Sequence, residues 1–399
     1  MPRPAYFVAM KPRLHAEDPV ADPGFETLCA HFGEDPAGQF GAASVPIYQT
    51  STFIYPDAEA FEARRGPDTP HYDYTRGGNP TAAVLEAKLA RLERGAWAES
   101  FGSGMGAISA AINLAVRSDA HVVCVGNVYS PTSAYLRHIE RFGVRTTFVR
   151  DVDPQAFIDA ITPATRLMYL ESPTTGLFEI LDVRAITSVC RERGIVTIFD
   201  NSCASSLFQS PLEMGCDLVV HSATKYIGGH SDVVAGMVIG RDERLRDRLF
   251  REIELCGATL DPFAAWLLVR GLRTLALRMR HHEQAALTVA LVLSGHQAVR
   301  KVHHPGLESH PQHTLAKSQM RGFSSLFSFE LVDQSREATL TFLNRLRLFR
   351  QGVSWGGHES LAIGGRLFGG PNPQSRVIRL HCGLESIPDL VADVVQALA

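Results

Sequence analysis

Short apolar runs alternate with amphipathic stretches from about residue 80 to residue 240, and this alternation most constrains the fold. Runs in which successive residues are all apolar are typical of strands buried on both faces of a sheet. When helices separate such strands along the chain, the expected product is a parallel sheet covered by helices on both sides. We therefore predict an α/β fold, with strands at 121–126, 146–150, 166–172, 195–202 and 217–222.

The same pattern divides the chain into three parts. Residues 1–60 are rich in proline, glycine and aspartate and lack periodicity, so we predict an extended N-terminal arm. Residues 61–257 carry the alternation and form the predicted large domain. Its expected helices lie at 81–94, 105–116, 133–142 and 183–193.

A smaller α/β domain is predicted at 258–399, because the pattern changes after about residue 255. It begins with a helical stretch at 262–298, which is followed by strands at 326–332 and 377–382. The glycine-rich segment 364–373 is a predicted surface loop, and with the arm segment 48–65 it is an expected specificity element.

Composition narrows the possible partners and the compartment. The net charge of −3 gives no general attraction to nucleic acid or to anionic lipid, and no apolar run is long enough to span a membrane. The seven dispersed cysteines form no CxxC pair, and no secretory h-region opens the chain, so we expect reduced thiols in the cytoplasm.

The histidine pairs at 281–282 and 303–304 lack carboxylate or cysteine partners, so no metal site is predicted. The run 241–252 mixes arginines with acids and is expected to be a solvated, salt-bridged helix face.

Lys225 is the first candidate for chemistry. It lies in His-Ser-Ala-Thr-Lys-Tyr, directly after a predicted buried strand, where ligands of parallel sheets bind. Burial disfavours an ammonium ion and lowers its pKa, as a Schiff-base lysine requires. The hydroxyls of Ser222 and Thr224 flank it and suit phosphate oxygens. A lone lysine after a strand is more often a surface residue, so its neighbours decide the interpretation.

Two further charges interrupt apolar strands. Asp200 ends the predicted strand 195–202, where it either caps the following segment or pairs with a buried cation. Opposite a pyridine nitrogen it would keep the ring protonated, which makes pyridoxal phosphate (PLP) an electron sink. Arg379 lies inside the predicted strand 377–382 and needs an anionic partner, which the carboxylate of an amino acid would provide.

Three weaker signals accompany them. The glycine-rich turn 101–106 opens a predicted helix, and helix N-termini bind anions such as phosphate. Tyr129 follows a strand and offers a ring that supports a flat ligand or simply packs. Tyr74 and Arg76 lie in a polar loop, where the arginine suits phosphate or carboxylate if it is not merely solvated.

Taken in order, these motifs closely resemble the Cys/Met-metabolism (transsulfuration) family of fold-type I PLP enzymes, which includes cystathionine and methionine lyases, cystathionine γ-synthase and O-acylhomoserine sulfhydrylases. The resemblance runs from about residue 40 to the C-terminus and is nearest to bacterial cystathionine β-lyase and methionine γ-lyase-like members. It implies a large, mostly parallel sheet domain of the seven-stranded type and a smaller C-terminal domain. The motifs are YTRGGNPT (74–81), FGSGMGA (101–107), YLESPT (169–174), DNS (200–202), HSATKYIGGHSD (221–232), RGLRTL (270–275), SWGGHESL (354–361) and IRLHCGLE (378–385).

The resemblance also implies a role for each candidate. Lys225 forms the Schiff base and acts as the general base, Asp200 binds the pyridine nitrogen, and Tyr129 stacks on the ring and is a candidate acid for the leaving sulfur. The phosphate is held by Gly104, Met105, Ser222 and Thr224, and from a neighbouring subunit by Tyr74 and Arg76. Arg379 and Ser354 bind the substrate carboxylate. The active unit would be at least a dimer with shared sites, and the protein a homotetramer built as a dimer of dimers.

Three positions depart from the family pattern or bear on specificity. Thr175 stands where many relatives have the asparagine expected to bind the phenolic oxygen of PLP. Val353 replaces the glutamate common in γ-lyases and γ-synthases, and Trp355 resembles cystathionine β-lyase. We therefore expect β-elimination that releases a thiol, pyruvate and ammonia. The alternatives are γ-elimination or γ-replacement, an aminotransferase, and a non-catalytic PLP-binding protein.

Overall fold

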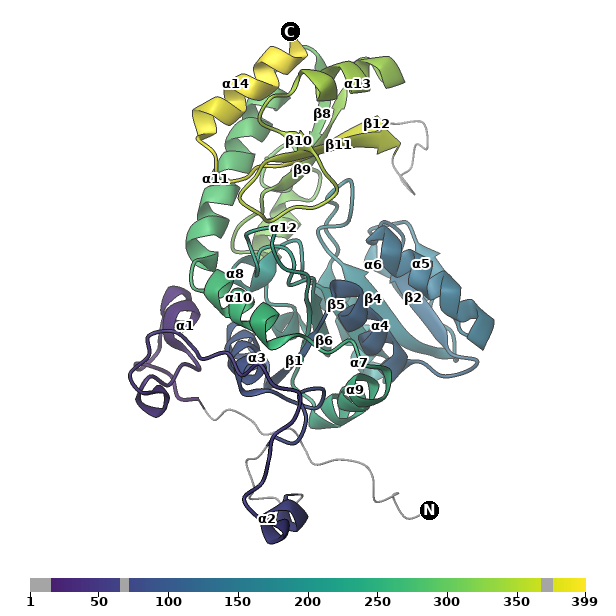
Figure 1. Ribbon diagram of the computed structural model, residues 1–399. Coiled ribbons are helices and arrows are strands. Elements are labelled where there is room, and N and C mark those ends of the chain that lie inside the picture. Colours follow the sequence, from purple (N-terminus) through teal and green to yellow (C-terminus); the bar gives the residue numbers. More distant parts are fainter. Residues whose placement is uncertain (1–15, 65–71, 367–375) are drawn as a thin grey trace.

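The computed structural model describes residues 16–64, 72–366 and 376–399 and contains two sheets (Figure 1). The large sheet has seven strands in the order β1-β7-β6-β5-β4-β2-β3. Only β7 is antiparallel to its neighbours, so the predicted mostly parallel seven-stranded sheet is confirmed. The strands are β1 (Trp97–Phe101), β2 (His121–Val125), β3 (Arg145–Val149), β4 (Thr165–Glu171), β5 (Val196–Asp200), β6 (Leu218–His221) and β7 (Gly236–Gly240).

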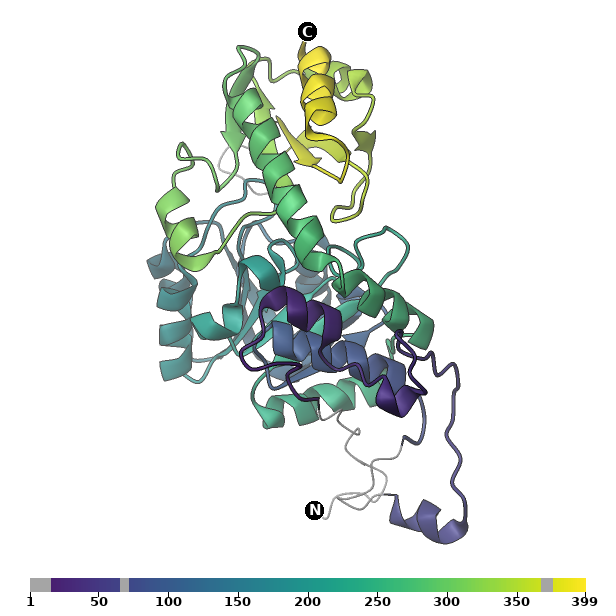
Figure 2. The same ribbon diagram turned by 90° about the vertical axis from the view of Figure 1, so that its left-hand side faces the viewer.

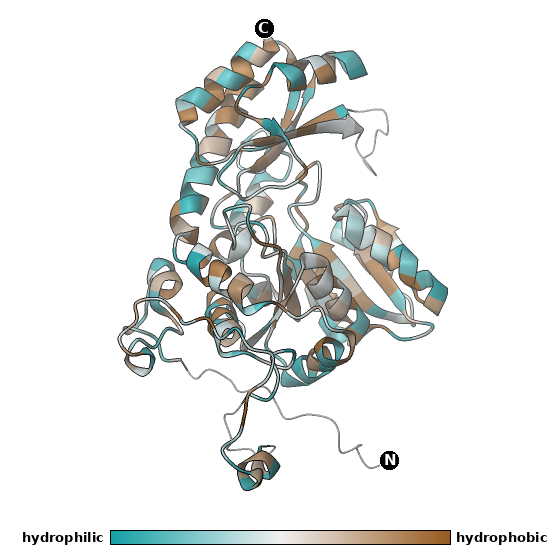
Figure 3. Ribbon diagram, in the orientation of Figure 1, coloured by the Kyte–Doolittle hydropathy of each residue, from teal (hydrophilic) through white to brown (hydrophobic). Residues whose placement is uncertain are grey.

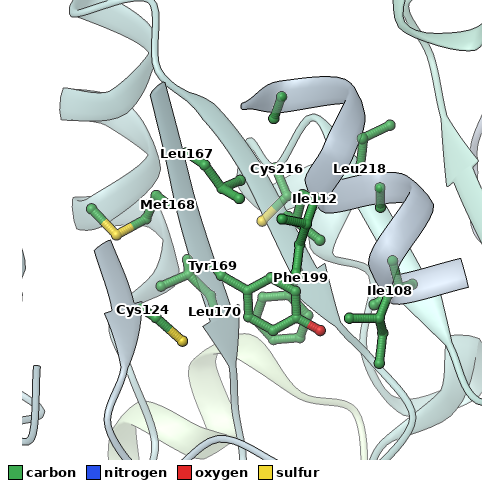
Figure 4. Packing of buried hydrophobic residues seen from close by; sticks show 14 of the residues in the cluster. Ile108, Ile112, Cys124, Leu167, Met168, Tyr169, Leu170, Phe199, Cys216 and Leu218 are labelled. Atoms are coloured by element: carbon green, nitrogen blue, oxygen red, sulfur yellow. The ribbon is translucent and has the colours of Figure 1, made fainter. Parts of the chain in front are cut away.

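Helices cover both faces of this sheet. Successive residues of β6 pack into two different buried clusters, one on each face. Leu218 and Val220 belong to one buried cluster, which includes Ile108 and Ile112 of a covering helix (Figure 4). Val219, between them, belongs to a second cluster on the other face. The strands of the large sheet are accordingly mostly hydrophobic in Figure 3. The helices of this part are α3 (Pro80–Leu92), α4 (Gly104–Ala115), α5 (Ser130–His138), η2 (Ile139–Phe142), α6 (Pro154–Asp159), α7 (Val183–Glu192), α8 (Ser205–Phe208), η3 (Pro211–Met214) and α9 (Glu243–Cys256).

All five predicted strands of the large sheet are confirmed, but β1 and β7 were not predicted. Glu99 sits in the middle of β1 and is fully buried, which contradicts the pattern of an apolar strand. Its carboxylate accepts a hydrogen bond from Nε of Arg246 on α9 at 2.9 Å. The expectation that 241–252 is entirely a solvated face was therefore wrong for Arg246, which turns inward to this buried acid.

The smaller C-terminal part is built on a five-stranded sheet, in the order β10-β11-β12-β9-β8. The predicted helix at 262–298 is two helices, which meet at Arg273–Thr274. The second of them, α11, runs from the large sheet to the small one, as Figures 1 and 2 show. The elements are α10 (Pro262–Leu272), α11 (Leu275–Ser294), β8 (Val299–His303), α12 (His313–Gln319), β9 (Leu326–Leu331), α13 (Arg336–Arg345), β10 (Arg350–Gln351), β11 (Leu361–Arg366), β12 (Arg376–His381) and α14 (Ile387–Leu398). A division of the chain at residues 257 and 258 stays a prediction.

The N-terminal region is less extended than predicted. Residues 1–15 lie outside the described residues, but α1 (Phe25–His31) packs through Leu28 and Cys29 and is followed by η1 (Ala37–Gln39). The chain then reaches α2 (Ala58–Ala63), which projects from the body at the end away from the small sheet (Figure 1). The predicted loop 364–373 begins as part of β11, and its residues 367–373 lie outside the described residues.

Two negative findings concern the described part of the chain alone. None of its helices combines the length and the apolar character needed to cross a membrane. Within the same residues, no group of three or more histidine, cysteine, aspartate or glutamate side chains is placed to hold a metal ion. The expectation that the histidine pairs lack carboxylate partners was wrong for His303, whose Nε2 lies 2.9 Å from Oε1 of Glu330.

Candidate active site

The carboxyl ends of β4, β5 and β6 bring the candidate residues together. Lys225 follows β6 in a tight turn, in which its backbone N–H donates to the carbonyl of Ser222. Asp200 is the last residue of β5, one strand away. The N–H of Ser222 also donates to Oγ of Ser202 at 2.6 Å, which ties the two strand ends together. Lys225 and Asp200, each expected at the end of a buried strand, therefore lie at one edge of the sheet.

The amine of Lys225 faces the small sheet domain. Its Nζ donates to Oγ of Ser354 at 2.8 Å and lies 4.4 Å from the ring centre of Trp355. No carboxylate within the described ranges forms a salt bridge with it. Burial, helped by the positive charge of Arg379, lowers the pKa of Lys225 to about 8. A larger share of the amine is thus neutral near neutral pH than in an ordinary lysine, which favours a nucleophile that forms Schiff bases.

Asp200 is a buried acid that has no lysine or arginine partner among the described residues. Its side chain is only 6% exposed, and Oδ1 accepts from the N–H of Ser202 at 3.0 Å. Burial raises the pKa of Asp200, because no lysine or arginine in the described part of the chain pairs with it. A protonated pyridine nitrogen would supply the missing positive charge, so this carboxylate fits PLP.

Glu171, the last residue of β4, is a second buried acid whose role the sequence reasoning missed. Its Oε2 accepts from the N–H of Tyr129 at 2.8 Å, and its Oε1 accepts from Oγ1 of Thr175 at 2.6 Å. Burial, followed by the nearby charge of Asp200, raises the pKa of Glu171 to about 8. Its position at the end of an apolar strand, like that of Asp200, is the signal that could have found it.

Thr175 and Tyr129 are therefore both hydrogen-bonded to Glu171. The hydroxyl of Thr175 is committed to Glu171, so it is not free to replace the asparagine of the relatives without giving up that bond. The ring of Tyr129 is half-buried, and its backbone is fixed by Glu171. Burial and the charges of Asp200 and Glu171 raise the pKa of Tyr129, which keeps its hydroxyl protonated near neutral pH.

The start of α4 forms an anion cradle with the turn after β6. Gly104 begins the helix, and a Cβ there would lie 2.9 Å from Oγ of Ser222 and 3.0 Å from its Cβ. Only glycine therefore leaves room for this approach, while the N–H groups of Gly104 and Met105 belong to the free first turn of the helix. Ser103 caps the helix through the N–H of Gly106 at 2.9 Å.

Thr224 contributes less to this cradle than expected. Its hydroxyl donates to the carbonyl of Ala235 at 3.1 Å and accepts from the N–H of the same residue at 3.0 Å. A hydroxyl has one hydrogen, so Thr224 has none left for a phosphate oxygen in this arrangement. Ser222, whose Oγ faces the helix start, is the better phosphate donor of the pair.

Arg379 and the loop 353–357 line the side of the site opposite the large sheet. Nη2 of Arg379 donates to the carbonyls of Val353 at 3.2 Å and Ser354 at 3.0 Å. Its Nε is buried without a hydrogen-bond partner, and burial lowers the pKa of Arg379 to about 10. A half-buried guanidinium whose Nε–H is buried and has no partner fits a substrate carboxylate. Val353 is 83% exposed at the mouth of this loop.

Tyr74 and Arg76 are not part of this cluster. Both are exposed, and the guanidinium of Arg76 lies 5.3 Å from the ring centre of Tyr74. Among the residues that the structure describes, no hydrogen bond or ring contact joins either of them to Lys225, Ser222 or Gly104. This separation agrees with the expected role of the pair at the site of a neighbouring subunit, which stays a prediction.

These features define the class of protein. A lysine with a lowered pKa, an uncompensated buried aspartate and an anion cradle fit the aldehyde, the pyridine nitrogen and the phosphate of PLP. The unpartnered Nε of Arg379 fits an amino-acid carboxylate. The site is therefore that of a PLP-dependent enzyme acting on amino acids.

Comparison with known proteins identifies the family. The chain belongs to the Cys/Met metabolism PLP-dependent enzymes, whose family profile matches residues 26–399. It is 40% identical to L-methionine gamma-lyase of Pseudomonas putida over 388 residues, covering 94% of this chain and 97% of that one. It is 43% identical to the probable cystathionine gamma-synthase of Herpetosiphon aurantiacus, covering 82% of this chain and 100% of that one.

A solved structure supports the same assignment. The crystal structure of metB from Corynebacterium glutamicum superposes with a TM-score of 0.87 at 33% identity, covering 94% of this chain and 98% of that one. The fold-type I architecture, the family and PLP as cofactor, each first expected from the motifs, are thereby confirmed.

Proposed function

We propose that this enzyme cleaves a carbon–sulfur bond by β-elimination, acting on cystathionine or a related cysteine-derived amino acid. The observation that carries the proposal is the position of the Lys225 amine, held between Oγ of Ser354 and the face of Trp355. β-Elimination needs one proton removed, from Cα. γ-Elimination also needs a proton moved at Cβ, so the amine of Lys225 would have to reach two carbon atoms of the substrate.

In this proposal each residue has a defined task. Arg379 binds the substrate carboxylate and orients Cα toward Nζ of Lys225, which removes the Cα proton. Bound PLP supplies the electron sink, and Asp200 keeps its ring nitrogen protonated. The electrons of the Cβ–S bond leave with sulfur, which takes up a proton, with Tyr129 as its candidate donor. Water then completes the release of pyruvate and ammonia beside the free thiol.

The keto acid identifies the reaction. With cystathionine we expect pyruvate, ammonia and homocysteine, because cleavage occurs on the cysteine side of sulfur. The measurement is chromatography of the keto acids together with a thiol assay. Methionine and O-acetylhomoserine serve as controls, since neither has a leaving group at Cβ. Production of 2-oxobutanoate as the main keto acid would overturn the β-elimination proposal.

γ-Elimination or γ-replacement is the second candidate, and it is favoured by the names of the relatives. Those are gamma-lyases and gamma-synthases, including the cystathionine gamma-lyase of Bacillus subtilis at 38% identity. A new thioether formed from an activated homoserine and cysteine would identify replacement. An aminotransferase would instead need an added oxo acid and would release neither ammonia nor thiol.

We further propose a homo-oligomer with shared sites, a dimer of dimers, in which Tyr74 and Arg76 serve the neighbouring subunit. The support is the 48% exposure of Tyr74 and, among the described residues, the lack of any hydrogen bond or ring contact between the pair and Lys225, Ser222 or Gly104. A cytoplasmic location is proposed from the seven cysteines, none of which is paired in a disulfide.

Subunit complementation tests the shared site. Lys225→Ala and Arg76→Ala are each expected to be nearly inactive alone. In a one-to-one mixture reassembled from both, half of the dimers are hybrids and one of their two sites is intact, so about a quarter of wild-type activity should return. Steady-state assays after refolding measure it. If Arg76 acts within its own subunit, both hybrid sites are defective and no activity returns.

A further inference from the structure

Strand β12 carries two side chains that hold the loop 353–357. Arg379 donates to the carbonyls of Val353 and Ser354, as described above. His381, two residues further along the same strand, lies 3.0 Å through Nε2 from the backbone nitrogen of Gly356. Residues two apart on a strand share a face. One face of β12 therefore contacts both ends of the segment that carries Ser354 and Trp355.

His381 contacts the loop through Nε2 and Ser325 through Nδ1. Nε2 lies 3.0 Å from the backbone nitrogen of Gly356, which donates, and 3.3 Å from the carbonyl oxygen of Gly357, which accepts. Nδ1 lies 2.5 Å from Oγ of Ser325, a hydroxyl that can either donate or accept. Burial, with the positive charges of Arg379 and Lys225 nearby, lowers the pKa of His381 well below its ordinary value and keeps the ring neutral.

The network continues to the residue next to the catalytic lysine. Oγ of Ser325 lies 2.5 Å from the hydroxyl of Tyr226, and the N–H of Ser325 also donates to that hydroxyl at 3.2 Å. Tyr226 is fully buried and directly follows Lys225. His381 is thus bonded on one side to the loop and on the other to the segment of the lysine.

Gly356 shows how closely the loop lies on that segment. It has a φ of +83°, and a Cβ there would lie 2.7 Å from the backbone nitrogen of Tyr226 and 2.8 Å from the carbonyl carbon of Lys225. Both the left-handed conformation and the contact require glycine. The bond from Gly356 to His381 therefore sets where the loop rests against the lysine.

We propose that His381 is a positioning residue, which holds the loop 353–357 in the register that brings Ser354 and Trp355 to the amine of Lys225. The inference rests on the proposed function, because the loop serves the reaction only if Lys225 and Arg379 form the active site. His381 touches neither the amine nor any reacting atom, and it acts through Gly356.

Two substitutions separate the bonds of His381. In His381→Gln the side-chain oxygen reaches roughly the position of Nε2 and keeps an acceptor for Gly356. In His381→Asn the amide reaches only the position of Nδ1, so it keeps Ser325 and loses Gly356. We expect His381→Asn to raise KM by roughly ten-fold, with a smaller change in kcat, and His381→Gln to restore KM to near the wild-type value.

His282→Asn is the matched control. Its ring lies 5.4 Å from that of His381 and is equally buried, and its Nδ1 bonds to the carbonyl of Cys382 rather than to the loop. All three variants are compared as holoenzymes by KM, kcat, thermal unfolding and the pH dependence of the visible absorption of bound PLP. The absorption titration should shift in His381→Asn alone, because only there do Ser354 and Trp355 move relative to the lysine.

The outcomes distinguish this inference from the function it rests on. Equal KM values for His381→Asn and His381→Gln, or an equal rise in His282→Asn, would show that the network merely packs. If His381→Asn does not fold, Gly356→Ala tests the same register from the loop side and must raise KM likewise. Failure of the active-site assignment itself would appear as intact PLP absorption in Lys225→Ala, whatever the His381 variants do.

Discussion

Lys225→Ala is expected to lose both turnover and the visible absorption of Schiff-base PLP. The side chain supplies the amine that bonds the cofactor and then removes the Cα proton, so kcat should fall by at least ~1,000-fold. Its lowered pKa of about 8 and its contact with Ser354 at 2.8 Å mark it as the reactive amine of the site. The absorption spectrum of the purified protein and a single-turnover assay provide the two measurements.

Two control variants test whether the loss is specific to the amine of Lys225. Lys225→Arg keeps a positive charge in the same place but cannot form a Schiff base, so it should be as inactive as the alanine variant. Lys317→Ala, at an exposed position on α12, should behave as the wild type. A Lys225→Ala enzyme that kept its colour and its activity would remove the lysine from the mechanism.

Arg379→Ala is expected to raise KM by roughly 100-fold or more while PLP stays bound. The guanidinium is held by two loop carbonyls and keeps a buried N–H without a partner, so the substrate carboxylate would complete its bonding. Removing one member of such a buried charge pair leaves the other unpaired, which costs several kcal/mol. Kinetics at increasing substrate concentration and the absorption of bound PLP measure the two halves of the prediction.

A substrate amide isolates the contact. Wild-type enzyme should bind the carboxamide of the substrate far more weakly than the acid, whereas Arg379→Ala should hardly distinguish them. Arg379→Lys keeps the charge but not the planar fork, and an intermediate KM is expected. Loss of PLP from Arg379→Ala would mean that this arginine serves the cofactor and not the carboxylate.

Sequence patterns were sufficient where a residue's environment is set by its own segment. Strands β2, β4, β5 and β6 were predictable because each is largely a run of buried apolar residues, whereas the edge strand β3 is only partly buried and only partly apolar. Lys225, Asp200 and Arg379 stood out because each places a charge in or just after such a run. β1 could not be predicted, since the partner that makes Glu99 tolerable is Arg246, far along the chain.

The contacts that position the site residues were likewise not predictable from local patterns, although the place of Glu171 at a strand end was itself a signal. Glu171 bonds to the backbone of Tyr129 from 42 residues further along the chain, and His381 reaches Gly356 from 25 residues further along. Thr224 matched its motif, yet its hydroxyl is taken up by Ala235, a contact that no local pattern encodes. Sequence thus identifies the residues that contact a ligand more readily than the residues that position those side chains.

The site also spans two bodies. Lys225 belongs to the large sheet, while Ser354 and Arg379 belong to the small one, and the helix α11 joins the two (Figure 2). A substrate whose carboxylate is bound by Arg379, and which is also bonded to the cofactor near Lys225, would link the two sheets and fix their relative position. The free energy of carboxylate binding can therefore be used to align the reacting atoms. An amine analogue that lacks the carboxylate would be turned over more slowly as well as bound more weakly.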